Sequence, residues 1–526
     1  MSPSVLLLND GNVVDKETSP SNGVDAAKSS TSAVLHRTLH HDPHHVVGAQ
    51  GHYLRLSNGQ EIFDATGGAA VACIGHGDVR VQDALIEQMH EVSYCHSLFY
   101  ATRAAEDLAK FLVDSTDGEM SRAFFVSSGS EAMEAALKMA RQYHLEKAQP
   151  EPQRAHFISR HQSYHGTTLG ALAAGGHVAR RAIFEPMLAT NSSRVSPCYA
   201  YRGLNSANDT EAAYTKRLEA ELDAAFQRVG PKKVAAFIAE PVVGAALGCV
   251  PPVAGYFKAV RRICDKYDAL LIFDEVMCGT GRIGPEPSTR FPKPLHAWQD
   301  PLIGVVPDLQ TLGKGLGGGY MPVAAMLASA HVVEVLEHGT GAFSHGQTYQ
   351  GHPLACKAAL EVQKIIQEDN LIANVRKQGA LLGRLLKERL GSHSTVGNIR
   401  GSGLFWAIEF VKCRASKTPF EPALGVAMGL HELGMQRPYN VSLYPGTGSA
   451  DGRRGDHIIL APAYNITSDE IRHLVETVTM VVTQFFTAHG AELRDAAAAM
   501  PTAKIVESGS EPVLIESSVM HRPARR

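Results

Sequence analysis

One lysine stands among glycines between Thr311 and Pro322, in the stretch TLGKGLGGGYMP. A surface loop is one explanation, because glycine allows turns at φ > 0 and an exposed lysine is ordinary. A phosphate-binding P-loop is excluded, because that motif needs glycine and Ser or Thr where Asp308 and Gly315 stand. The other interpretation is a lysine that a planar group can approach closely, as a Schiff-base nucleophile requires.

Several apolar runs elsewhere in the chain end abruptly in polar residues. Apolar runs that alternate with helical patterns predict parallel strands covered on both faces. In such sheets the chemistry lies beyond the carboxyl ends of the strands. The sequence therefore predicts one edge that carries the residues following the runs at 124–126, 157–159, 234–239 and 269–273, which include Ser128, Tyr164, Glu240 and Asp274.

The segment Ser127 to Ala132 joins the first of these runs to a helical pattern marked by Met133, Leu137 and Tyr143. A strand, a turn of small residues and a helix N-terminus form an anion site, since unpaired N–H groups and the helix dipole point there. An ordinary N-cap by Ser128 or Ser130 is the alternative. The two interpretations are compatible.

Gly279 to Gly284 reads GTGRIG and matches the glycine fingerprint of nucleotide-binding dehydrogenases. That fingerprint must open a helix, and prolines at 285, 287, 292 and 294 oppose one here. We therefore predict a loop and keep an NAD(P)-dependent dehydrogenase only as an alternative.

Composition limits the classes of partner. A chain of 526 residues is expected to form at least two domains, and a formal charge of −3 gives no reason to expect nucleic acid or a membrane as partner. The eight cysteines are scattered, which favours reduced thiols and a cytoplasmic protein. A histidine-rich segment at 40–45 lacks the spacing of a metal site, so we predict no metal.

The polar start and end of the chain predict a disordered leader over 1–33 and a flexible tail over 491–526. An Asn-Gly pair at 58–59 predicts a β-hairpin, and Thr467 to Glu470 predicts a capping box that opens a last helix through Phe486.

Taken together, the motifs resemble those of the class III aminotransferases, which use pyridoxal phosphate (PLP). The resemblance runs from about Leu39 to Phe486 and rests on six motifs: Ser127 to Ala132, Tyr164-His165-Gly166, Glu240-Pro241, Asp274-Glu275-Val276, Lys314-Gly315 and His345 to Thr348. It implies an α/β protein of PLP fold type I. Residues 76–340 would form a large αβα domain with a mainly parallel sheet, and 34–75 with 341–490 a smaller α+β domain.

The resemblance also implies roles for the reacting groups. Lys314 would hold PLP as a Schiff base and move a proton during transfer, which suits lysine because burial lowers its pKa. Asp274 would keep the pyridine nitrogen protonated. Tyr164 and Val276 would cover the two faces of the ring, and Glu240 would belong to the same cofactor site.

At the two ends of the site, Gly129 and Ser130 would bind the phosphate, together with Thr348 donated by a second subunit. The resemblance thus implies a homodimer with shared active sites. Arg400, just before a strand expected over 403–411, would bind a substrate carboxylate, because a planar guanidinium suits that group.

Two departures favour the ω-transaminase-like branch. Ala245 and Met277 stand where the ornithine and 4-aminobutyrate enzymes carry Glu and Gln. The expected reaction is ping-pong transfer of an amino group from an amino acid or amine to a keto acid, ketone or aldehyde. A PLP-dependent aminomutase, racemase or decarboxylase of the same fold is the alternative.

Overall fold

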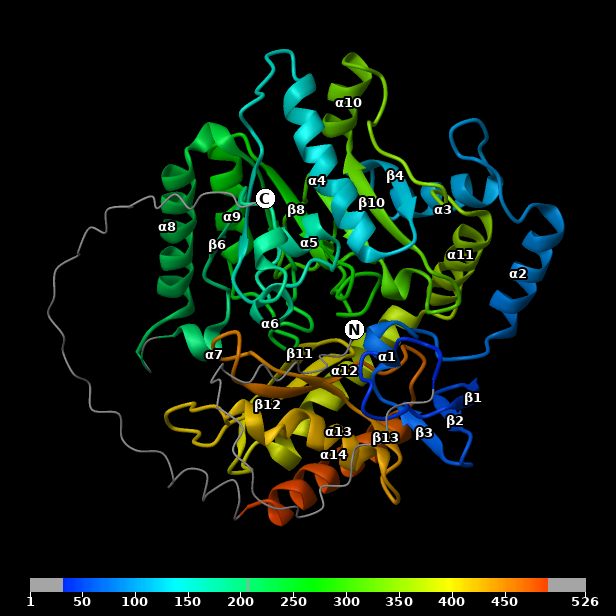
Figure 1. Cartoon of the computed structure of the whole chain (residues 1–526), viewed down its shortest axis with the longest axis vertical. Coiled ribbons are helices and arrows are strands. Elements are labelled where there is room, and N and C mark those ends of the chain that lie inside the picture. Colours follow the sequence, from blue (N-terminus) through cyan, green and yellow to red (C-terminus); the bar gives the residue numbers. More distant parts are fainter. Residues whose placement is uncertain (1–31, 205, 207, 491–526) are drawn as a thin grey trace, which may run out of the picture.

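The computed structural model describes residues 32–204, 206 and 208–490. A seven-stranded sheet lies at its centre, in the order β4-β10-β9-β8-β7-β5-β6 (Figure 1). Strand β10 runs antiparallel to both of its neighbours, and the remaining pairs are parallel, so the prediction of a mainly parallel sheet is confirmed. The strands are β4 (Met120–Val126), β5 (His156–Arg160), β6 (Ser192–Val195), β7 (Val234–Ala239), β8 (Leu270–Asp274), β9 (Leu309–Leu312) and β10 (Ala324–Ser329).

Helices cover both faces of this sheet, because successive side chains of a buried strand point to opposite sides. In β7, Phe237 packs in one apolar cluster with helices α8 and α9, and Ile238 packs in another with α4 and α10. The helices around the sheet are α2 (Val79–Glu91), α3 (Arg103–Asp114), α4 (Gly129–Glu146), α5 (Leu169–Ala174), α6 (Val178–Arg181), α7 (Ala200–Gly203), α8 (Glu211–Val229), α9 (Tyr256–Lys266), α10 (Ala330–His338) and α11 (Pro353–Glu368).

The N-terminal and C-terminal parts of the described chain lie together below the large sheet in Figure 1. The predicted hairpin is confirmed, since β2 and β3 pair antiparallel, and β13 from the C-terminal part extends the same sheet in the order β1-β2-β3-β13. A third sheet has the order β11-β12-β15-β14. These elements are β1 (Val46–Gln50), β2 (Tyr53–Leu56), β3 (Glu61–Asp64), α1 (Gly67–Ala70), α12 (Leu371–Leu390), β11 (Val396–Ser402), β12 (Phe405–Phe410), α13 (Val426–Met435), β13 (Val441–Ser442), β14 (Tyr444–Gly446), β15 (Asp456–Leu460) and α14 (Ser468–Ala488).

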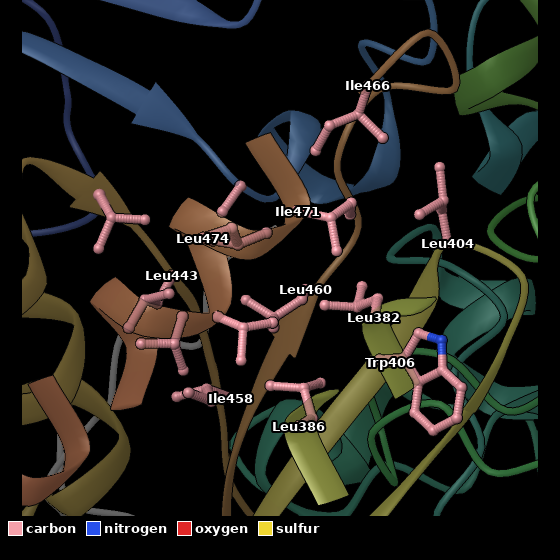
Figure 2. Packing of buried hydrophobic residues seen from close by; sticks show 14 of the residues in the cluster. Leu382, Leu386, Leu404, Trp406, Leu443, Ile458, Leu460, Ile466, Ile471 and Leu474 are labelled. Carbon is pink, nitrogen blue, oxygen red and sulfur yellow. The ribbon is translucent and has the colours of Figure 1, made fainter. Parts of the chain in front are cut away.

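One apolar core joins this C-terminal part. Figure 2 shows Leu382 and Leu386 of α12 pointing toward Leu460 of β15 and Ile471 of α14. The predicted capping box opens α14, where the Thr467 hydroxyl accepts from Glu470 N–H and the Glu470 carboxylate accepts from Thr467 N–H. The helix therefore begins where the sequence predicts and presents its apolar face to the sheet.

Other sequence predictions have mixed outcomes. Residues 279–284 form consecutive turns with Gly281 and Gly284 at positive φ, so the predicted loop is confirmed and no helix follows the glycine fingerprint. The sequence predicted one strand, over 403–411, with Arg400 just before it. The structure has two antiparallel strands, β11 and β12, connected by a turn at Gly403, and Arg400 lies within β11. The predicted leader and tail fall on residues 1–31 and 491–526, outside the described residues, and the domain boundaries stay a prediction.

The close packing of α12 against the turn of the third sheet can be tested by substitution. A Cβ added at Gly379 would lie 2.1 Å from the Gly403 carbonyl oxygen, so Gly379→Ala forces backbone apart and is expected to lower the free energy of unfolding by about 1–3 kcal/mol. Urea unfolding followed by circular dichroism measures this change. Arg384→Ala, on the exposed side of the same helix, is the control; equal stability of Gly379→Ala and wild type would contradict the close contact.

Candidate active site

A cavity of about 420 Å³ opens at the carboxyl ends of the parallel strands, within the size range of small-molecule sites. It brings together seven of the site residues predicted from the sequence: Gly129, Ser130, Tyr164, Glu240, Asp274, Val276 and Lys314. They come from the ends of different strands and from the loops that follow, as the strand-end argument expects.

Lys314 follows β9 and begins a single 3₁₀ turn, with φ +47°, a left-handed backbone conformation that a lysine rarely adopts. The amide of Gln363 holds the turn by donating to the carbonyls of Gly315 and Leu316 at 3.0 and 2.9 Å. Burial lowers the pKa of the Lys314 ammonium, and the carboxylates of Asp274 and Glu240 only partly oppose this shift. A larger fraction of the amine is therefore neutral, and thus nucleophilic, than for an exposed lysine.

Asp274 is the last residue of β8 and is 5% exposed. Its Oδ2 lies 2.8 Å from His165 Nδ1, and its Oδ1 accepts from Val276 N–H at 3.1 Å. A carboxylate oxygen can only accept, so the imidazole proton sits on Nδ1. The histidine was part of a sequence motif, but the sequence assigned it no role; here it fixes the orientation of the carboxylate.

The N-terminus of α4 forms the opposite end of the cavity. Ser128 caps the helix by accepting from Glu131 N–H at 3.3 Å, so the alternative of an N-cap is confirmed. Gly129 and Ser130 line the cavity, and the N–H groups of a first helical turn have no partner within the helix. A Cβ at Gly129 would lie 2.8 Å from Val276 Cγ1. Glycine is thus required here because the valine packs directly against the helix start.

The side chain of Glu240 is hydrogen-bonded to the backbone of Tyr164. Glu240 Oε1 accepts from Tyr164 N–H at 3.2 Å, and its Oε2 accepts from Gly244 N–H at 2.8 Å. Burial raises the pKa of Glu240. The carboxyl group therefore holds the tyrosine segment and the loop after β7 together, and the tyrosine ring lines the cavity.

Two predicted residues do not line this cavity. Thr348 lies in an exposed turn, where its carbonyl accepts from the Tyr94 hydroxyl at 3.0 Å. Arg400 is buried, and its guanidinium contacts Glu409 at 2.8 Å and donates to the carbonyls of Leu247 and Gly248. A single chain thus lacks the threonine of the expected phosphate site and holds the expected carboxylate-binding arginine in an internal ion pair.

Sequence reasoning missed other cavity residues. Arg180 of α6 and Tyr444 of β14 line the wall near Tyr164, and no motif in the sequence indicates either. Ala245 and Met277, the two departures from the ornithine and 4-aminobutyrate enzymes, also line the cavity. The departures therefore change the shape and polarity of the site itself.

These residues fit PLP. A helix N-terminus suits its phosphate, a half-buried lysine amine suits its aldehyde, a fixed carboxylate suits its ring nitrogen, and Tyr164 offers an aromatic surface. Among the described residues, no group of three or more His, Cys, Asp or Glu side chains is arranged to hold a metal ion. Within the same part of the chain, none of the helices has the length and apolar character needed to span a membrane.

The comparisons with known proteins agree with this geometry. Residues 35–482 match the family model for aminotransferase class III. An aminotransferase of Gibberella zeae is 50% identical over 449 residues, which are 85% of each chain, and γ-aminobutyrate transaminase 3 of Solanum lycopersicum is 34% identical over 81% of this chain and 78% of its own. The crystal structure of the ω-transaminase from Pseudomonas jessenii in complex with PMP superposes with a TM-score of 0.77 at 30% identity, over 85% of this chain and 94% of that one.

The fold and the cavity are those of a PLP-dependent transferase of fold type I. Within that class, the chain belongs to the class III aminotransferases and is a transaminase.

Contact between Gly129 and Val276 gives a test of the cofactor site. We expect Gly129→Ala to weaken PLP affinity by roughly 5- to 150-fold, because a clash of about 1–3 kcal/mol displaces the phosphate end of the site. In a Val276→Ala background, which removes the clashing methyl groups, the same substitution should cost much less. Equilibrium dialysis measures the PLP affinity of wild type, the two single variants and the double variant. An equal loss of affinity from Gly129→Ala in both backgrounds would contradict the packing argument.

Proposed function

We propose that this transaminase works by a ping-pong mechanism in which Lys314 carries the transfer. An amino acid or amine gives up its amino group in the first half-reaction, and a keto acid, ketone or aldehyde receives it in the second. The observation that supports this most is the placement of the Lys314 amine and the Asp274 carboxylate in one cavity with the α4 N-terminus. PLP supplies an electrophilic carbon and a ring that accepts electron density.

In this proposal Lys314 acts twice through the same atom. Its neutral Nζ would hold the aldehyde carbon of the cofactor, which its lowered pKa favours because a protonated amine is not nucleophilic. The same Nζ, when it is not attached to the cofactor, would take up the proton that leaves the substrate carbon. The fixed turn of residues 313–317 keeps the amine within the cavity during both steps.

Asp274 would hold a proton at the ring nitrogen of the cofactor, and His165 is its positioning residue. The α4 N-terminus, with Gly129 and Ser130, would bind the phosphate dianion through N–H groups and the helix dipole. Tyr164 and Val276 would cover the two faces of the ring, and Glu240 fixes the tyrosine segment.

We also infer a homodimer with shared sites. Thr348 lies in an exposed turn whose carbonyl accepts from the Tyr94 hydroxyl, and its neighbour Tyr349 packs on the Tyr94 ring. Tyr349 is 57% exposed, and Leu98 and Phe99, which follow Tyr94 in the chain, are 74% and 72% exposed. Exposed apolar side chains gathered in this way indicate a protein contact. A second copy seated here would cover them and bring its threonine to a phosphate site that the single chain leaves incomplete. Eight free cysteines fit a reducing, cytoplasmic compartment.

Aminomutase, racemase and decarboxylase chemistry would use the same lysine and aspartate. We favour transamination because the matched relatives are named as transaminases. Only transamination leaves the amino group on the cofactor when no acceptor is present.

Visible absorbance of the purified protein with PLP tests the role of Lys314. We expect a band that the Lys314→Ala variant lacks and that excess amine bleaches in wild type, with pyridoxamine phosphate accumulating. Lys258→Ala, an exposed lysine on α9, should behave as wild type. Consumption of amine without pyridoxamine phosphate would favour the mutase or racemase; the same band in Lys314→Ala would exclude the lysine.

Mixing two inactive variants tests the shared site. Lys314→Ala lacks the nucleophile, and Thr348→Ala should bind PLP poorly, so both should be nearly inactive at limiting PLP. If each site takes its lysine from one subunit and its threonine from the other, a mixed dimer has about one intact site. Refolding the two together should restore activity, measured as acceptor-dependent turnover. If the mixture is no more active than the separate variants, either each site takes its lysine and its threonine from the same subunit, or Thr348 does not bind the phosphate.

A further inference from the structure

A second cavity reaches the residue that holds the lysine turn. It measures about 780 Å³ and is lined by the ends of α3 and α11, the start of α12 and the loop of residues 290–295. The helices α3 and α11 lie side by side (Figure 1). Gln363 of α11 lines this cavity and also donates to the lysine turn. The second cavity and the active-site cavity share no lining residue among those that the structure describes.

The glycine motif at 279–284 shapes one wall of the second cavity. Added Cβ atoms at Gly281 and Gly284 would lie 2.9 Å from Ile372 Cγ1 and 3.0 Å from Arg376 Cγ. The first turns of α12 therefore pack directly on the motif, and Ile372 and Arg376 line the cavity. The proline-rich segment after the motif forms another wall. The motif thus has a structural role in this chain.

Gln363 is 1% exposed, and the two polar atoms of its amide have different environments. Its Nε2 donates to the carbonyls of Gly315 and Leu316, while its Oε1 has no hydrogen-bond partner in the part of the chain that the structure describes. The two atoms diverge from one carbon, so Oε1 points away from the lysine turn. A buried acceptor without a partner is unfavourable, and a ligand that donates a hydrogen bond would relieve this.

The charged side chains of the second cavity leave one cation and one anion unpaired. Lys293 and Asp117 form no ion pair with any residue that the structure describes. A ligand that carries one charge of each sign therefore complements the cavity. The other charged side chains have partners: Arg290 pairs with Glu119, Asp114 with Lys110, and Arg376 donates to the Pro285 carbonyl.

We propose that the second cavity is a regulatory site for a zwitterionic α-amino acid with an apolar side chain. The ammonium group would donate to Gln363 Oε1, and Asp117 would balance its charge. The carboxylate would face Lys293, and the apolar side chain would pack on Phe111 and Ile366. This inference goes beyond the proposed function, since it concerns a separate site.

Gln363 would connect this site to catalysis. An amide that accepts a hydrogen bond at its oxygen donates more strongly through its nitrogen. An occupied second cavity would therefore strengthen the bonds from Gln363 Nε2 to Gly315 and Leu316, and so tighten the turn that carries Lys314.

Calorimetry with borohydride-reduced holoenzyme measures the binding. Reduction attaches PLP permanently to Lys314, so that an added amino acid cannot react in the active site. Leucine is the probe, and three matched compounds each lack one of its groups: 4-methylpentanoate the amine, 3-methylbutan-1-amine the carboxylate, and glycine the apolar side chain. We expect leucine to bind more tightly than any of the three.

Two variants separate the contacts. Lys293→Gln should weaken leucine binding roughly 3- to 10-fold and leave 3-methylbutan-1-amine unchanged, because it removes a partly exposed charged contact. Gln363→Met should weaken leucine binding roughly 10- to 100-fold and 4-methylpentanoate less than about threefold, because it removes the buried acceptor. Lys258→Ala, which removes an exposed lysine outside the cavity, should behave as wild type.

Tryptophan emission locates the bound leucine. The protein has two tryptophans, and Trp298 packs edge-on against Phe291, which lines the second cavity, at 5.2 Å between ring centres. In a Trp406→Phe background the emission comes from Trp298 alone, and leucine should change it. Hydrogen–deuterium exchange of residues 311–322 tests the link to the lysine turn; leucine should slow it in wild type and not in Gln363→Met.

The absence of saturable leucine binding up to about 10 mM would overturn the proposal. Equal leucine binding in wild type, Lys293→Gln and Gln363→Met would also overturn it. Binding without slower exchange at 311–322 would refute the regulatory link. If borohydride does not fix PLP on Lys314, the proposed function fails; leucine binding to the PLP-free protein and the same variants then decides about the second cavity.

Discussion

The active site depends on burying two carboxylates, each with hydrogen-bond partners, beside a partly buried amine. Asp274 has His165 and a backbone N–H, Glu240 has two backbone N–H groups, and Lys314 faces both carboxylates. Next in the chain, Glu275 accepts from the N–H groups of Ala297 and Trp298, yet burial still raises its pKa to about 7. The low polarity around the site therefore shifts the pKa values of several groups at once.

Rigid elements keep these groups in place. Asp274 ends a fully buried strand, and the lysine turn is held by Gln363 from α11. Val276 packs between Gly129 and Gly313, where added Cβ atoms would lie 2.8 and 3.2 Å from its Cγ1. Glycines in this region therefore serve close packing as much as turning, because the strand end, the helix start and the lysine turn converge on one valine.

The sequence predicted those parts of the site that depend on local pattern. Apolar runs located β7 and β8, and the residues after them line the cavity as expected. It could not predict contacts between distant segments, such as His165 with Asp274, which are 109 residues apart. Arg180 lies in a four-residue helix with no motif, and the environment of Arg400 depends on pairing between two strands. Residue type alone does not distinguish a substrate-binding arginine from one committed to a buried ion pair.

Arg400 forms its ion pair with Glu409 of the neighbouring strand and not with a residue that lines the cavity. In an enzyme whose arginine faces a movable glutamate across the cavity, the cation can be masked or exposed during the two half-reactions. Ala245 removes that option here, and the counter-ion comes instead from the adjacent strand, where it also binds Arg202 and Tyr199. A counter-ion tied by three partners cannot withdraw without breaking the network. Ala245 and Met277 give the cavity apolar surface at the two positions where the ornithine and 4-aminobutyrate enzymes carry polar side chains.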